Sequence, residues 1–191
     1  MFEEKIFIQP DELLQDSFLL GAQILDSGFR PDYIVGIWRG GTPVGIAVQE
    51  LLDYAGITTD HIAIRTSYYT GIEKTADQVQ VHGLGYLIDK VSHEDRLLIV
   101  DDVFDTGKSI EGVLTEMGVR ARRNMPYDVR IATPWYKPSK NVTDNSPDYY
   151  IHETDRWLVF PHELKGLSLE EVRIGKPDIF HIVNNVSSGG E

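Results

Sequence analysis

The stretch from Arg96 to Ile110, RLLIVDDVFDTGKSI, decides the fold of this chain. Its apolar run, Leu97–Val100, is typical of a strand buried on both faces of a parallel sheet. The carboxylates of Asp101 and Asp102 follow directly, then the small-residue loop Asp105–Ser109, after which a helix is expected. Acids and a loop therefore lie between the carboxyl end of a strand and a helix N-terminus, where open α/β sheets bind ligands.

The loop suits a phosphate group, because its backbone N–H groups and the helix dipole both favour an anion. It is not a Walker A loop, although Gly107-Lys108-Ser109 is similar to the end of one. That motif needs a glycine five positions before its second glycine, and here the position holds Asp102, which would repel nucleotide phosphates. Two adjacent acids can instead accept hydrogen bonds from vicinal hydroxyls. The stretch therefore predicts a site for a ribose that carries a 5-phosphate.

This segment resembles the motif that binds 5-phosphoribosyl 1-pyrophosphate (PRPP) in type I phosphoribosyltransferases, in which an apolar strand leads into two acids and then D-T-G-x-[ST]. The resemblance implies the α/β fold of that family, a parallel-rich twisted sheet flanked by helices with a small hood subdomain from the chain ends. It also implies that Asp101 and Asp102 hold the ribose hydroxyls, directly or through Mg²⁺. The loop Asp105–Ser109 would hold the 5-phosphate, mainly through backbone N–H groups and through the hydroxyls of Thr106 and Ser109.

Composition narrows the class of protein. The chain has 191 residues and a net charge of −12. This negative charge opposes binding to nucleic acid. It also means that a polyphosphate ligand would need a divalent cation such as Mg²⁺ between it and the protein. It has no run of about 18 apolar residues, so no membrane-spanning helix is expected. The N-terminus, MFEEKIFIQP, is too polar for a signal peptide, and cysteine is absent. A cytoplasmic protein without a membrane partner is the expectation.

The rest of the chain alternates strand and helix patterns, as a parallel-rich sheet requires. We expect one domain over residues 1–191, with a core of about 30–140, a hood from about 1–30 and 140–180, and a disordered tail at 187–191. Residues 66–85 are polar and aperiodic, which is typical of a lid or mobile loop. Helices are expected at 10–27, 43–54, 110–117 and 168–172, and strands at 33–37, 61–65, 97–100, 129–133, 149–151 and 157–160.

Two further loops are candidates for the pyrophosphate half of the site. Arg39-Gly40-Gly41 ends a strand just before a helix, and on its own it reads as an ordinary tight turn. Beside the PRPP motif it is similar to the family's R-G-G loop, which holds pyrophosphate. Ser67-Tyr68 opens the long polar segment, where the family carries a Ser-Tyr pair in a loop that closes over the site and excludes water. Lys74 is a weaker candidate in the same segment.

The base-binding residues rest on the resemblance to the purine branch. Asp105 matches an aspartate that bonds N7 of the base and acts as general acid or base. Lys137, followed by a proline, matches a lysine that contacts the O6 atom of 6-oxopurines. Trp157 would stack on the purine and the Leu158 backbone would contact its edge, while Glu163 matches an acid that reaches a second metal ion.

These observations predict a Mg²⁺-dependent enzyme that transfers the phosphoribosyl group of PRPP to a 6-oxopurine base: hypoxanthine, guanine or xanthine. Two alternatives stay open, a phosphoribosyltransferase for a different base and a non-catalytic PRPP-sensing regulator. The regulator is disfavoured by the acidic charge and by the first sheet strand near residue 33, which leaves no room for a DNA-binding module before it. The family resemblance also implies a homo-oligomer, a dimer or tetramer.

Overall fold

A computed structural model describes residues 5–68 and 79–188 of the chain. The chain divides into two compact units, residues 14–155 and a smaller unit made of the chain ends, residues 1–13 and 156–191. The sequence predicted a hood from the chain ends with wider limits, about 1–30 and 140–180. Each unit is described by itself below.

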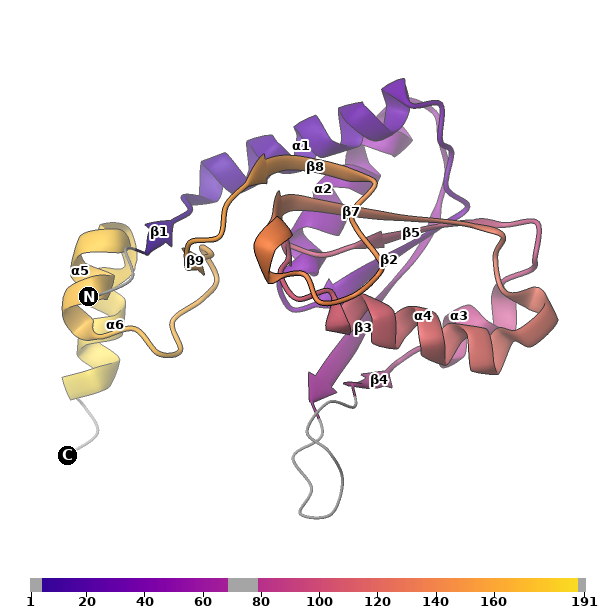
Figure 1. The fold of residues 1–191 in the computed structure, drawn as a ribbon. Helices are drawn as coiled ribbons and strands as arrows, with labels where there is room; N and C mark the ends of the chain where they lie inside the picture. Colours follow the sequence, from indigo (N-terminus) through magenta and orange to yellow (C-terminus); the bar gives the residue numbers. More distant parts are fainter. Residues whose placement is uncertain (1–4, 69–78, 189–191) are drawn as a thin grey trace, which may run out of the picture. The chain divides into compact units, whose positions relative to one another are not determined.

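The larger unit is built on a seven-stranded sheet with the order β4-β3-β2-β5-β7-β6, in which β8 also pairs with β7 (Figure 1). All neighbouring strands are parallel except β3 and β4. The predicted parallel-rich α/β sheet is therefore confirmed. The strands are β2 (Tyr33–Trp38), β3 (Asp60–Tyr68), β4 (Val79–His82), β5 (Arg96–Val100), β6 (Val103–Phe104), β7 (Asp128–Tyr136) and β8 (Tyr149–Glu153).

Helices flank this sheet, α2 against one face and α3 and α4 against the other (Figure 1). The helices up to β8 are α1 (Pro10–Asp26), α2 (Gly41–Tyr54), α3 (Gly85–Lys90) and α4 (Lys108–Ala121). Short 3₁₀ turns lie at Arg122–Asn124 and Pro138–Lys140. Helix α1 is tied to β8 by a hydrogen bond of 2.9 Å between Asp16 and His152. No helix of the described residues is long and apolar enough to cross a membrane.

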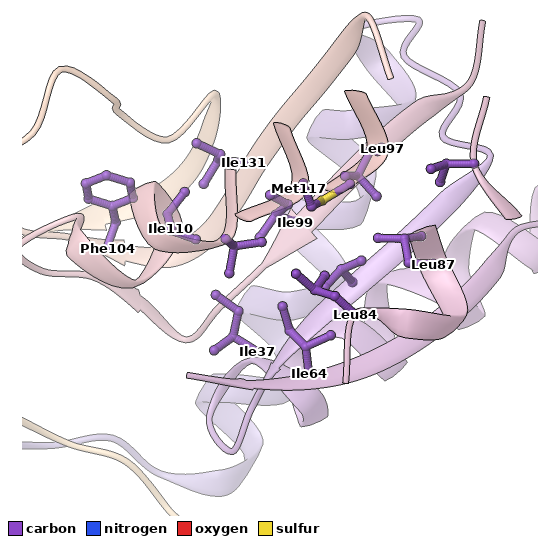
Figure 2. Packing of buried hydrophobic residues seen from close by; sticks show 14 residues of the cluster. Ile37, Ile64, Leu84, Leu87, Leu97, Ile99, Phe104, Ile110, Met117 and Ile131 are labelled. Carbon is purple, nitrogen blue, oxygen red and sulfur yellow. The ribbon is translucent and has the colours of Figure 1, made fainter. Parts of the chain in front are cut away.

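The main core lies between the sheet and helices α3 and α4 (Figure 2). Apolar residues at alternate positions of β2 and β5, such as Val35, Ile37, Leu97 and Ile99, meet the apolar stripe of α4 that includes Met117. This alternation is what a sheet face predicts, and the 3.6-residue period of α4 presents its matching side. The core thus fixes the end of β5 against the start of α4, where the acids and the loop lie.

The region between β3 and α3 differs from its prediction. The sequence suggested an aperiodic loop over 66–85, but β3 continues to Tyr68 and β4 returns antiparallel to it, before α3 begins at Gly85. The alternation Val79-Gln80-Val81-His82 is the pattern of a strand, but it is too short, in its polar context, to predict one from the sequence alone. Residues 69–78, including Lys74, lie outside the described residues.

The smaller unit joins the two ends of the chain. Strand β1 (Ile6–Phe7) pairs in parallel with β9 (Leu158–Val159), and α5 (Leu169–Gly175) precedes α6 (Pro177–Ser188). Ser168 and Glu171 form a capping box at the start of α5. Helix α6 continues to Ser188, so the disorder expected from residue 187 does not hold for the last two residues of the helix; residues 189–191 lie outside the described part.

Candidate active site

A cavity of about 190 Å³ opens at the carboxyl end of β5. This is the edge at which parallel α/β sheets place ligands. One continuous segment supplies its walls, since the lining residues are Asp101, Asp102, Val103, Phe104, Asp105, Thr106, Gly107, Ser109 and Ile110. The structure therefore gathers around one cavity most of the residues that the sequence assigned to the sugar and the 5-phosphate.

The two acids occupy a break in a strand. Strands β5 and β6 pair with β7 in the same register, and only Asp101 and Asp102 separate them. The Asp101 N–H still bonds the carbonyl of Ala132 at 3.2 Å. The next N–H that a parallel ladder would take from β7 belongs to Pro134, which has none. The chain is thus released from the sheet at the acid pair.

The environment of Asp101 disfavours its charged form. Burial raises the pKa of the Asp101 carboxyl well above its ordinary value, and the neighbouring charge of Asp102 raises this pKa further. The N–H groups of Asp102, at 3.0 Å, and of Gly41 donate to the Asp101 carboxylate and partly oppose that rise. A nearby cation would stabilise the charged form of such a pair of acids.

The Arg39–Gly41 loop lies directly against the acids. A Cβ atom on Gly40 would collide with the carboxylate of Asp102, and one on Gly41 would collide with the carbonyl of Val100. Both positions must therefore be glycine for the loop to come this close. Arg39 is exposed, and the preceding Trp38 exposes 58% of its surface.

Asp105, which lines the cavity, forms an ion pair with Lys137. Lys137 follows the end of β7, and its Nζ atom donates a hydrogen bond to Oδ2 of Asp105 at 2.8 Å. The lysine side chain is 9% exposed and that of Asp105 is 44% exposed. The lysine is thus a buried cation directed at a carboxylate that solvent can still reach.

Ser67 and Tyr68 end β3 rather than opening a loop. They pair with Gln80 and Val79 of β4, and the Ser67 hydroxyl lies 3.4 Å from Nε2 of His82. The predicted position in a loop is therefore wrong for these two residues.

Three predicted residues of the base and metal sites belong to the smaller unit. Trp157 exposes 56% of its surface, and its carbonyl accepts a hydrogen bond from the Ile6 N–H at 2.8 Å. Leu158 is buried in β9. Oε2 of Glu163 accepts the Phe160 N–H at 3.1 Å, so this carboxylate also closes a local turn.

The donor set at the cavity suits a shared cation better than an all-protein metal site. No group of three or more His, Cys, Asp or Glu side chains that could hold a metal occurs in residues 5–68 and 79–188. Mg²⁺ is commonly held by one or two carboxylates with the remaining oxygens from water and substrate phosphate. Asp101 and Asp102 offer such a pair of hard oxygen donors.

Residues 11–167 match the model of the phosphoribosyl transferase domain. The chain belongs to this family. A curated relative, the xanthine-guanine phosphoribosyltransferase of Cereibacter sphaeroides, is 28% identical over 182 residues that cover 90% of this chain and 94% of the relative.

Solved structures of similar fold include the purine phosphoribosyltransferase of Pyrococcus horikoshii, which is 27% identical. The alignment covers 86% of this chain and 97% of that protein, with a TM-score of 0.64. A hypothetical protein from Neisseria gonorrhoeae with bound ppGpp is 18% identical and has a TM-score of 0.72. That alignment covers 93% of this chain and 99% of the other protein. The latter likeness concerns the fold alone.

Sequence reasoning missed the segment that packs against the loop Asp105–Ser109. Asn141 and Thr143 lie against Gly107, although more than 30 positions separate them from it in the chain. The pattern Asn-x-Thr is too common to have identified them. His82, beside Ser67, was likewise hidden in the segment interpreted as a loop.

Proposed function

We propose that this protein transfers the 5-phosphoribosyl group of PRPP to a 6-oxopurine, hypoxanthine or guanine and also xanthine, and releases pyrophosphate. The observation that carries the proposal is the Asp105–Lys137 pair at the rim of the acid-lined cavity. A carboxylate and an ammonium 2.8 Å apart match the N7 and O6 edge of a 6-oxopurine. The xanthine-guanine phosphoribosyltransferase at 28% identity supports the 6-oxopurine class, and the purine phosphoribosyltransferase at 27% identity supports a purine base.

The PRPP half of the site is assigned to the cavity residues. The ribose hydroxyls would bond to Asp101 and Asp102, whose carboxylates accept hydrogen bonds. The 5-phosphate would be held by the N–H groups of the loop that leads into α4, with hydroxyls from Thr106 and Ser109, at the positive end of the helix dipole. Pyrophosphate would leave along Arg39–Gly41, with Ser67 and Tyr68 covering it.

A divalent cation belongs in this scheme because two acids line a site for a polyanion. The Asp101–Asp102 pair would hold Mg²⁺ together with oxygens of PRPP, and Glu163 would reach a second ion. An ion held by these residues would supply positive charge that offsets part of the charge on the leaving pyrophosphate. The protein residues position the sugar and keep water from reacting with it.

The transfer exchanges one bond at C1 of the ribose for another. The bond from C1 to the pyrophosphate oxygen breaks, and N9 of the base attacks the opposite face of C1 with inversion. A base that starts with its proton on N7 then loses that proton to the Asp105 carboxylate, while Lys137 donates to O6. Trp157 would stack on the base and the Leu158 backbone would contact its edge.

A coupled assay of pyrophosphate release tests the proposal. The purified chain is incubated with PRPP, Mg²⁺ and one base at a time: hypoxanthine, guanine, xanthine, adenine, uracil or orotate. We expect turnover with the 6-oxopurines and little with the others. Turnover of adenine alone would overturn the role of Lys137. PRPP binding without turnover of any base would favour the non-catalytic PRPP sensor.

A further inference from the structure

The segment that follows β7 runs beside the phosphate loop and holds it at two points. The Lys137 N–H bonds the carbonyl of Phe104 at 2.9 Å, and the Val142 N–H bonds the carbonyl of Thr106 at 3.1 Å. The last carbonyl of β6, just before the loop, and one carbonyl within the loop are thereby tied to the same segment. We call residues 137–143 the loop brace.

The brace also fills the space beside the loop's glycine. Gly107 has φ of 79°, a conformation that favours glycine. A Cβ atom here would collide with Oγ1 of Thr143 and would lie 2.9 Å from Oδ1 of Asn141. Position 107 therefore requires glycine for two reasons: its backbone conformation, and the close approach of the brace.

One side chain organises the end of the brace. Oδ1 of Asn141 accepts hydrogen bonds from the N–H and the hydroxyl of Thr143, each at 3.0 Å, and its Nδ2 donates to the carbonyl of Asn145 at 2.8 Å. These three bonds fix Thr143 against Gly107 and orient the Val142 N–H toward Thr106. Neither Asn141 nor Thr143 lines the cavity.

We infer that Asn141 is a positioning residue for the 5-phosphate subsite, acting through Thr143 and Val142 on the loop Asp105–Ser109. An anion site made of backbone N–H groups binds tightly only if those groups are aligned beforehand. Anchoring the Phe104 and Thr106 carbonyls sets the orientation of the intervening peptide groups. The inference rests on the proposed function, which places the phosphate in this loop.

The test compares Asn141→Ala with Asn145→Ala. The second variant removes a neighbouring amide side chain but keeps the backbone carbonyl that Asn141 uses. We expect Asn141→Ala to raise the KM for PRPP and the Kd for ribose 5-phosphate about tenfold, because the three hydrogen bonds of the Asn141 side chain, each of modest strength, are lost. The KM for the purine should change less than twofold.

Amide hydrogen exchange supplies a readout that does not depend on activity. The amides of residues 105–109 should exchange several-fold faster in Asn141→Ala than in the Asn145→Ala control. A folded Asn141→Ala protein with unchanged exchange and unchanged Kd for ribose 5-phosphate would overturn the inference, as would an equal rise in both KM values. If Asn141→Ala does not fold, Thr143→Val gives the same comparison. Absence of ribose 5-phosphate binding by the wild type would instead count against the proposed function, while the exchange data would still report on the brace.

Discussion

The Nζ atom of Lys137 donates a hydrogen bond to Oδ2 of Asp105 at 2.8 Å, which joins the end of β7 to the loop that follows β6. The lysine is buried, whereas nearly half of the Asp105 side chain is exposed. The carboxylate is therefore the member of the pair that solvent reaches more readily. The pair presents a donor and an acceptor side by side, which is the order that O6 and a protonated N7 require.

The role of Asp105 in proton transfer is tested by Asp105→Asn. The amide keeps an acceptor for Lys137 but cannot take a proton, so kcat should fall by about 10²–10⁴ while the KM for PRPP changes little. Steady-state kinetics with guanine and hypoxanthine measure both quantities. Asp89→Asn, on the exposed surface of α3, is the matched control and should behave as the wild type. An unchanged kcat in Asp105→Asn would remove the residue from proton transfer.

Lys137→Met tests the selection of 6-oxopurines. Methionine fills a similar volume but loses the ammonium, and a hydrogen bond to a charged group contributes about 1.5–3 kcal/mol. The KM for guanine should therefore rise roughly 10- to 100-fold, with little change for PRPP. Lys140→Met, three residues later and exposed, serves as control. If the ratio of guanine to adenine turnover stays the same, Lys137 does not select the base.

The sequence predicts the parts of this site that are local in the chain. Asp101, Asp102 and the loop that follows them lie in one stretch between a buried strand and a helix, so their order alone places them at one edge of the sheet. The Asp105–Lys137 ion pair and the contact of Thr143 with Gly107 join distant residues. Their geometry depends on the register of β7 against β5 and β6, which no local pattern specifies.

Close approach of the Arg39–Gly41 loop to the acids makes Gly40 sensitive to a single methyl group. Its φ is −68°, so alanine meets no backbone strain, but the new Cβ would displace the carboxylate of Asp102. Forcing an extra atom into a packed site costs about 1–3 kcal/mol, and Gly40→Ala should raise the KM for PRPP roughly 5- to 100-fold.

Gly118→Ala is the matched control for this prediction. Gly118 is exposed in α4, and nothing lies within 4 Å of its Cβ position. Alanine should stabilise the helix by about 0.5–1 kcal/mol and raise Tm by about 1–4 °C without a change in KM. Equal KM values for PRPP in the two variants would show that Asp102 does not depend on the glycine.

Acid should destabilise the smaller unit through Glu171. Hydrogen bonds from Lys5, at 2.6 Å, and from the N–H and hydroxyl of Ser168 lower the pKa of the Glu171 carboxyl from 4.5 to about 2. Because the folded-state pKa lies below the unfolded value, the stabilisation is present above pH 4.5 and is lost as the pH falls through about 2.

Glu171→Gln removes this titration. Between pH 4.5 and 2 its free energy of unfolding should depend less steeply on pH than that of the wild type, as measured by denaturant unfolding followed by far-UV circular dichroism. Glu94→Gln, an exposed acid in the larger unit, should keep the wild-type slope. High salt should reduce the difference, since the Lys5–Glu171 pair is partly open to solvent. Identical slopes for the wild type and Glu171→Gln at low salt would mean that the capping box and the Lys5 pair do not stabilise the folded unit through the charge of Glu171.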